Sequence, residues 1–304
     1  MSRQDIELGT KKRNFSRIKA LLNYGGLKHG IPNITGPLEI EATYKKTHNS
    51  YQRFTPEELK SLFHSEAYQK HKFDKASQFW LPILGLYTGA RIEELASLLV
   101  DKVCEIDGVW CYFLSSADAN LGGKNQFAPR WVPIHPVVLH AGFLEHWRTV
   151  RDEGHARLFP ELGNAERDGP GKRATVDFTE YRRSVGVGAD EGRSTKVFHS
   201  FRSTLVSELI RRKTDNYLRH KLLGHSVGEE DAKFKGVHYD VYDQSNFEAK
   251  RAFKLLSKAD FGLTHPKFED TSKMKAARAR CLRKAVRAAV VKPSRPRSTR
   301  STKT

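Results

Sequence analysis

Five basic residues and one tyrosine, each within a distinct local motif, could together act on a phosphodiester. They are Arg91 in TGARIEEL, Lys124 in GGKNQFAPRWVPIHP, His199 and Arg202 in HSFR, His225 in LLGHS, and Tyr239 in GVHYDVYD. A phosphodiester under attack gains negative charge on its non-bridging oxygens, which guanidiniums hold bidentately and histidines meet with hydrogen bonds. A lysine can protonate the leaving 5′-oxygen, and a tyrosine can form a covalent intermediate. This chemistry needs no metal and no cofactor, and no acidic metal-binding cluster is evident in the sequence.

The elements that position these residues are predicted to be mostly helices. Apolar residues recur at helical spacing through most of the chain. Thr55 and Glu58 form a capping box around Pro56, which marks a strong helix start. We expect helices at about 13–29, from Thr55, at 75–88, from Arg91 through Leu99, and at 136–151, 176–184, 199–212, 215–223 and 246–259. The Gly- and Pro-rich residues 161–174 are interpreted as a surface loop.

A short stretch of the chain changes from helical to strand periodicity. Asp107-Gly108 is flanked by Cys104–Ile106 and Val109–Phe113, which is a hairpin signal. Arg130–Ile134 supplies a third strand after a polar loop. The predicted fold class is therefore mainly α with a small three-stranded antiparallel sheet (α+β). The hairpin places Cys104 opposite Cys111, but in a reducing compartment free thiols are expected for these two and for the third cysteine.

Charge is the main compositional signal in this chain of 304 residues. The formal net charge is +18, and residues 271–304 contain 12 Lys and Arg and no acid, which leaves +6 on the first 270. A basic excess favours polyanionic partners; the alternative is a soluble basic surface with no specific partner. No apolar run approaches the roughly 20 residues of a membrane span. The N-terminus lacks the apolar stretch of a secretory signal, so we expect a cytoplasmic protein without a membrane partner.

The ordered series of motifs resembles the catalytic domain of the tyrosine recombinases, the phage integrase family. The resemblance runs from about Arg53 to Lys258. It implies a tyrosine recombinase catalytic-domain fold that cuts and rejoins double-stranded DNA through a 3′-phosphotyrosine, without metal or cofactor. It further implies a homo-oligomer on DNA, accessory DNA-bending proteins as further candidate partners, and association with the nucleoid when bound.

The resemblance also implies a role for each residue of the series. The nucleophile is Tyr239, the proton donor to the 5′-oxygen is Lys124, and the transition state is bound by Arg91, His199, Arg202 and His225. Tyr242 is the alternative nucleophile, because the interval after the glycine-histidine motif is longer than is usual in the family.

Several of these residues have structural interpretations as well. Arg91 follows Gly89 at a helix start, where a cation opposes the helix dipole; an ion pair with Glu93 or Glu94 is the alternative to a phosphate clamp braced by Glu94. Lys124 could be a solvated loop lysine, with Lys102 as a weaker candidate for the acid. The histidine of LLGHS could cap the preceding helix, and His220 on that helix is interpreted as a surface residue.

The resemblance to the tyrosine recombinases also implies a division of the chain into four regions. Residues 1–38 are interpreted as a remnant of the core-binding domain helix and the start of the linker, residues 39–52 as linker, residues 53–262 as the catalytic domain, and residues 263–304 as a basic, largely disordered tail in which 273–290 can become helical on an acidic partner. Most of the core-binding domain is expected to be absent. The rival interpretations are a catalytically inactive or truncated integrase remnant that only binds DNA, and a type IB topoisomerase-like enzyme. An RNA-binding basic protein ranks last.

Overall fold

The computed structural model divides the chain into two units, Met1–Asn49 and Ser50–Thr304. It describes residues 8–30, 51–115, 129–163, 169–188, 196–224 and 248–290. In the first unit the described element is α1 (Leu8–His29). The predicted helix is confirmed; it begins five residues earlier than expected, and Gly25-Gly26 does not interrupt it.

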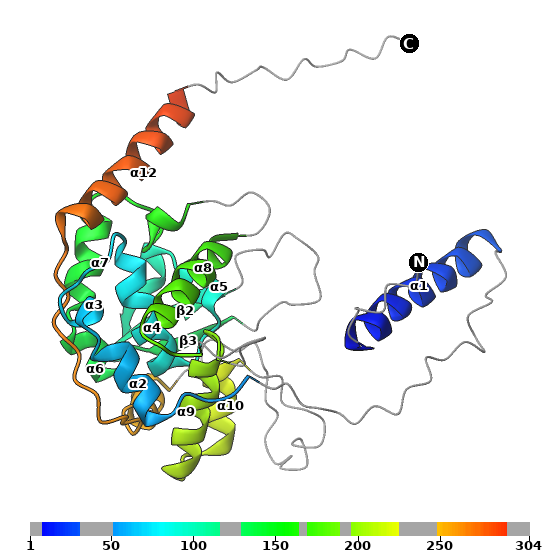
Figure 1. Cartoon of the computed structure of the whole chain (residues 1–304), viewed down its shortest axis with the longest axis horizontal. Coiled ribbons are helices and arrows are strands. Elements are labelled where there is room, and N and C mark those ends of the chain that lie inside the picture. The colour runs from blue at the N-terminus through cyan, green and yellow to red at the C-terminus, as the bar shows by residue number, and fades with distance from the viewer. Residues whose placement is uncertain are drawn as a thin grey trace. The chain divides into compact units, whose positions relative to one another are not determined.

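The second unit is mainly helical with one small sheet, as predicted (Figure 1). Its described helices and strands, with two short 3₁₀ turns, are α2 (Pro56–Phe63), α3 (Glu66–Gln69), α4 (Ala76–Thr88), α5 (Ile92–Ala96), η1 (Val100–Lys102), β1 (Val103–Ile106), β2 (Val109–Leu114), β3 (Arg130–Pro133), α6 (Pro136–His140), α7 (Phe143–Asp152), η2 (Pro160–Leu162), α8 (Gly169–Ser184), α9 (Ser200–Arg211), α10 (Asn216–Leu223), α11 (Ala249–Leu256) and α12 (Ser272–Val290). None of these described helices combines the length and the apolar character that a membrane crossing requires.

The sheet is antiparallel in the order β1-β2-β3. The hairpin at Asp107-Gly108 sets a register in which Cys104 lies opposite Cys111, as the sequence predicts. Both thiols are free, and burial raises the pKa of Cys111 to about 12. This thiol is therefore a packed core group rather than a reactive one.

The core is built around α4, whose residues are almost all buried because its sequence is apolar on every side. Helices α5, α8 and α9 pack against it. The capping box predicted at Thr55 is present at the start of α2. Helices α10 and α11 pack on β3.

Several predicted boundaries differ from the structure. The helix predicted at 246–259 ends at Leu256. Helix α5 ends at Ala96 rather than near Leu99. The helix predicted at 136–151 is two helices, because Gly142 adopts φ +92 between α6 and α7. The loop predicted at 161–174 is wrong at its C-terminal end, because α8 begins at Gly169 and Gly171 donates its N–H to Glu93 Oε2 at 2.8 Å.

The prediction of a largely disordered tail is wrong for residues 263–290. Phe268 inserts its ring among Phe79, Trp80 and His146, with centroid distances of 5.1 Å to each. Helix α12 follows, and its Met274 side chain is fully buried. The many cations of this region led to the prediction of disorder, but a few apolar side chains anchor it to the rest of the second unit. Residues 291–304 lie outside the described part of the chain.

Two buried histidines predict that the protein loses stability in mild acid. Burial lowers the pKa of His135 to about 4 and that of His146 to about 3. As pH falls below about 6.5 the unfolded chain binds protons that the folded chain cannot, so the free energy of unfolding falls. Between about pH 7.5 and about pH 5.5 we expect each histidine to contribute a loss of about 1.4 kcal/mol.

Urea unfolding at these two pH values measures the effect. The His146→Phe variant should lose the part of the pH dependence that His146 contributes, about 1.4 kcal/mol, and should stay folded because a phenyl ring can keep the stacking of His146 on Trp80, where the centroids lie 5.6 Å apart. His140→Gln is the control, because His140 is exposed. Equal pH dependence in all three proteins would contradict the prediction.

Candidate active site

Arg91 lies at the N-terminal end of α5, directly after the turn that ends α4. Gly89 makes this turn with φ +62, and a Cβ there would lie 2.7 Å from Cδ2 of Leu223, so the turn requires glycine. The backbone N–H of Arg91 donates to Oε2 of Glu94 at 2.7 Å, which caps the helix. The Arg91 side chain is 29% exposed, against 5% for that of Arg130.

Glu94 is fully buried, and its main ion-pair partner is Arg130, an arginine that the sequence motifs did not single out. Arg130, at the start of β3, donates to both carboxylate oxygens, at 2.7 Å and 3.1 Å. The guanidinium of Arg91 is farther away, with Nη1 3.9 Å from Oε1. Burial raises the pKa of Glu94, but the hydrogen bonds from Arg130 outweigh it and hold the pKa below its usual value. The Glu94 carboxylate therefore holds two arginines in place. It accepts from the backbone N–H of Arg91 and from the guanidinium of Arg130.

Arg202 is buried on α9 and joins two helix ends. Its Nη1 donates to the carbonyl of Gly89 at 2.8 Å, and its Nη2 donates to the carbonyl of Leu223. Arg130 adds a bond from Nε to the carbonyl of Leu222 at 2.7 Å. Carbonyls at helix C-termini carry partial negative charge, so they stabilise the buried guanidiniums. Burial lowers the pKa of Arg202 to about 10, as do the charges of Arg91 and Arg130, and it stays protonated at neutral pH.

His199 lies three residues before Arg202, at the N-terminal end of the same helix. Its ring centroid is 5.4 Å from that of Tyr51. Burial lowers the pKa of His199, and the charges of Arg202 and Arg91 lower it further. The imidazole is therefore neutral at pH 7 and can donate one hydrogen bond and accept another.

The structure thus brings together three residues of the predicted series, Arg91, His199 and Arg202. Lys124, His225 and Tyr239 lie outside the described residues, as does the alternative nucleophile Tyr242. Of the minor candidates, Lys102 pairs with Asp101 at 3.6 Å, and His220 on α10 is partly exposed.

Gly224 connects the described cluster to the motif that follows it. It ends α10 with φ +63, and a Cβ there would lie 2.8 Å from Nη1 of Arg130. The turn immediately before His225 therefore rests on Arg130. The signal for Arg130 in the sequence is weak: an arginine at a strand position next to Trp-Val-Pro, with nothing local to show that it is buried.

The arginine cluster, which we define as Arg91, Arg130 and Arg202, has Glu94 as its buried carboxylate. The positive charge of Arg130 contributes to lowering the pKa of Arg91 and that of Arg202, after the larger effect of burial. The cluster and Glu94 together carry a formal charge of two positive units in a partly dehydrated place, which favours an anion. Among the described residues no group of three or more His, Cys, Asp and Glu is arranged to hold a metal ion.

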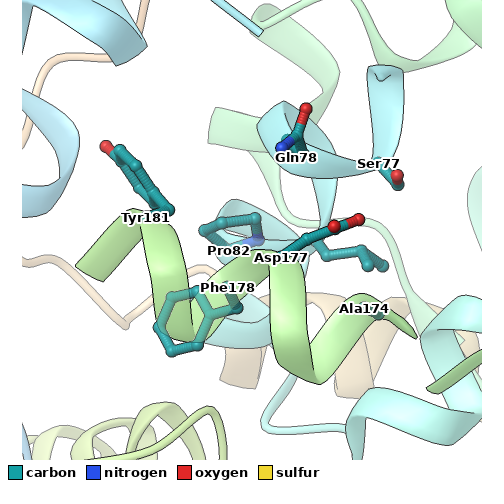
Figure 2. Close-up of a pocket in the computed structure, with 8 residues that line it drawn as sticks. Ser77, Gln78, Pro82, Ala174, Asp177, Phe178 and Tyr181 are labelled. Atoms are coloured by element: carbon teal, nitrogen blue, oxygen red, sulfur yellow. The ribbon is translucent and has the colours of Figure 1, made fainter. Parts of the chain in front are cut away.

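A small pocket between α4 and α8 is unrelated to this cluster (Figure 2). Pro82, Phe178 and Tyr181 line it with mainly apolar surface. The charge at its rim, Asp177, is neutralised by Lys75, with oxygens at 2.6 and 2.8 Å from Nζ. The pocket is a packing defect of the helical layer rather than a polar binding site.

No family model matches the sequence, and no curated protein matches it. Solved structures are similar. A XerH site-specific recombinase bound to a palindromic difH substrate, in a post-cleavage complex, is 16% identical with a TM-score of 0.51, over 75% of this chain and 63% of that one. The pre-cleavage complex of XerH with difH gives 16% and 0.50, over 78% and 64%. A lambda integrase dimer bound to a COC′ core site gives 15% and 0.46, over 74% of each chain.

The chain spans just under two thirds of the length of the XerH chains. At this level of identity the likeness to XerH shows the fold, which confirms the catalytic-domain architecture predicted from the motifs.

Proposed function

We propose that this chain, which has the fold of the tyrosine recombinases, is a site-specific DNA recombinase that acts through a 3′-phosphotyrosine. The observation that carries the proposal is the convergence of Arg91, His199 and Arg202 beside a turn that leads directly into His225. The XerH structures of the same fold are complexes with DNA substrate. A cationic cluster with one carboxylate suits a phosphodiester, which is a single negative charge shared by two non-bridging oxygens.

In the proposed reaction the oxygen of Tyr239 attacks the scissile phosphorus. The new phosphorus–tyrosine bond forms as the bond to the 5′-oxygen breaks, and Lys124 gives that oxygen a proton. His199 is neutral and accepts the tyrosine proton. The 5′-hydroxyl of a second strand then reverses the steps and releases the tyrosine.

The arginines have different duties in this scheme. Arg91 is partly exposed and offers its guanidinium to one non-bridging oxygen. Arg202 donates two hydrogen bonds to the carbonyls of Gly89 and Leu223. Its remaining N–H groups donate to the other non-bridging oxygen. His225 adds a further hydrogen bond to the phosphate. The charge of the transition state is met by side chains, and no metal has a role in the proposal.

Double-stranded DNA is the proposed partner, and several protomers are proposed to assemble on two DNA sites. Accessory DNA-bending proteins, a cytoplasmic location and association with the nucleoid belong to the same proposal.

Covalent trapping tests the proposal. The full chain is incubated with nicked suicide duplexes taken from the DNA that flanks its gene, denatured, and examined for a DNA–protein adduct. We expect an adduct that Tyr239→Phe abolishes and Tyr242→Phe retains. Loss only in Tyr242→Phe would keep the chemistry and reassign the nucleophile.

Two other outcomes would replace the proposal. Salt-sensitive DNA binding without any adduct would indicate an inactive remnant that only binds DNA. Relaxation of any supercoiled plasmid by a monomer would indicate a type IB topoisomerase-like enzyme.

A further inference from the structure

Helix α12 is anchored to the second unit along one face of its first half. Met274 is fully buried, and Ala277 and Arg278 are 9% and 1% exposed. These positions are three and four residues apart, so they lie on one side of the helix. The same spacing is what a docked amphipathic helix requires.

Arg278 fixes this docking with two carboxylates. Its Nε and Nη2 donate to the two oxygens of Glu153 at 2.8 and 2.9 Å, and its Nη1 donates to Asp270 at 2.9 Å. A guanidinium bound to two carboxylates in this way fixes both the position and the direction of the helix that carries it. Helix α12 therefore leaves the body of the second unit at a defined angle.

The second half of α12 extends away from that body (Figure 1). Leu282 and Val286 are 39% and 57% exposed, and the cations around them are exposed as well. We define the basic face of α12 as Arg280, Arg283, Lys284 and Arg287.

The basic face places like charges one helical turn apart, at Arg280 and Lys284 and at Arg283 and Arg287. Each such pair destabilises a helix in the absence of counter-charge. The helix contains no acidic residue, so the counter-charge has to come from outside it.

A polyanion other than this protein suits the basic face as the source of counter-charge. The first 270 residues carry a net charge of +6 and α12 carries seven cations, so a second copy would add repulsion. Duplex DNA supplies a continuous row of phosphates, and neutralising them releases counterions. An α-helix of 10–12 Å also matches the roughly 12 Å width of the major groove.

We propose that the basic face of α12 binds the phosphate backbone of duplex DNA as a contact separate from the arginine cluster. This inference rests on the proposed function only for the identity of the polyanion. It assigns the protein a second DNA-binding element, held in place by Arg278, that supplies affinity without taking part in strand cleavage.

Salt-dependent binding of the full chain to a fluorescein-labelled duplex of arbitrary sequence tests the inference. In the variant Arg280→Gln, Arg283→Gln, Lys284→Gln, Arg287→Gln, the slope of log K against log salt should become shallower by about 3 to 4. Affinity at the low-salt end should fall at least tenfold. The charge-preserving variant Arg280→Lys, Arg283→Lys, Arg287→Lys should bind as the unaltered chain does. The reason is that binding to the phosphate backbone depends on positive charge, which lysine keeps.

The matched control removes four exposed cations elsewhere, with Lys60→Gln, Lys70→Gln, Lys72→Gln and Arg148→Gln. It has the same net charge as the α12 variant and should change the slope by less than about 1. An equal loss in both variants would show that net charge alone is responsible and would overturn the inference, as would an unchanged slope in the α12 variant.

Far-UV circular dichroism and a thermal melt verify that each variant is folded. Adduct formation on a suicide duplex at saturating protein is measured in parallel and should be unaffected by the α12 substitutions. The two proposals therefore fail separately: an absent adduct with an α12-dependent slope would remove the recombinase chemistry and leave the DNA contact.

Discussion

Replacement of Arg130 by methionine should lower the free energy of unfolding by about 3 to 5 kcal/mol, one of the two largest effects that we expect from a single substitution. The reason is the carboxylate that Arg130 leaves behind. Glu94 has no exposed side-chain surface and receives two hydrogen bonds from Arg130, and the carbonyl of Leu222 receives a third. Urea unfolding at neutral pH measures the loss.

A double-mutant cycle separates this effect from simple loss of packing. Removal of both charges in Arg130→Met with Glu94→Met should be less destabilising than Arg130→Met alone, because no unpaired buried charge remains. Arg211→Met is the control, since its pair with Glu208 is 64% exposed on the arginine side and should contribute less than about 1 kcal/mol. Additive losses in the cycle, or a loss below about 1 kcal/mol for Arg130→Met, would contradict the prediction.

Replacement of Arg91 by alanine should slow formation of the DNA adduct by a factor of about 10² to 10³ while leaving the fold intact. Arg91 has the most exposed side chain of the cluster, and the helix cap at this position uses the backbone N–H, which alanine retains. Single-turnover rates on a suicide duplex, together with urea unfolding, measure both expectations. The change in unfolding free energy should stay below about 1 kcal/mol.

Two further variants show that the effect belongs to the guanidinium. Arg91→Lys keeps the charge but not the bidentate geometry and should recover only part of the rate. Lys102→Ala, which removes a surface cation paired with Asp101, should cleave as the unaltered chain does. A well-folded Arg91→Ala protein with unchanged cleavage would remove Arg91 from the site. Arg202→Ala is less informative, because the loss of its bonds to Gly89 and Leu223 should impair folding and cleavage together.

Local signals account for the parts of the fold that the sequence predicted well. Asp107-Gly108 set the hairpin and its register, and Thr55 with Glu58 set the start of α2. These features depend on residues a few positions apart. The order of short motifs predicted the fold of the second unit, and the structure places Arg91, His199 and Arg202 side by side.

Long-range ion pairs account for what the sequence did not reveal. Arg130 and Glu94 are 36 residues apart, and Arg278 and Glu153 are 125 residues apart. A charged residue in isolation favours the surface, so composition made Arg130 inconspicuous and made the C-terminal region resemble a disordered tail. The roles of Lys124, His225 and Tyr239 remain predictions from the motif series.

The ring of Phe268 among Phe79, Trp80 and His146 has a consequence for how the protein is made. The aromatic layer receives this ring from a residue synthesised almost 190 positions after Phe79. During translation the side chains that pack against Phe268 stay exposed on the nascent chain, where they can bind chaperones or aggregate. A chain that stops before Phe268 should therefore be poorly soluble, although every residue of the arginine cluster would already have been translated.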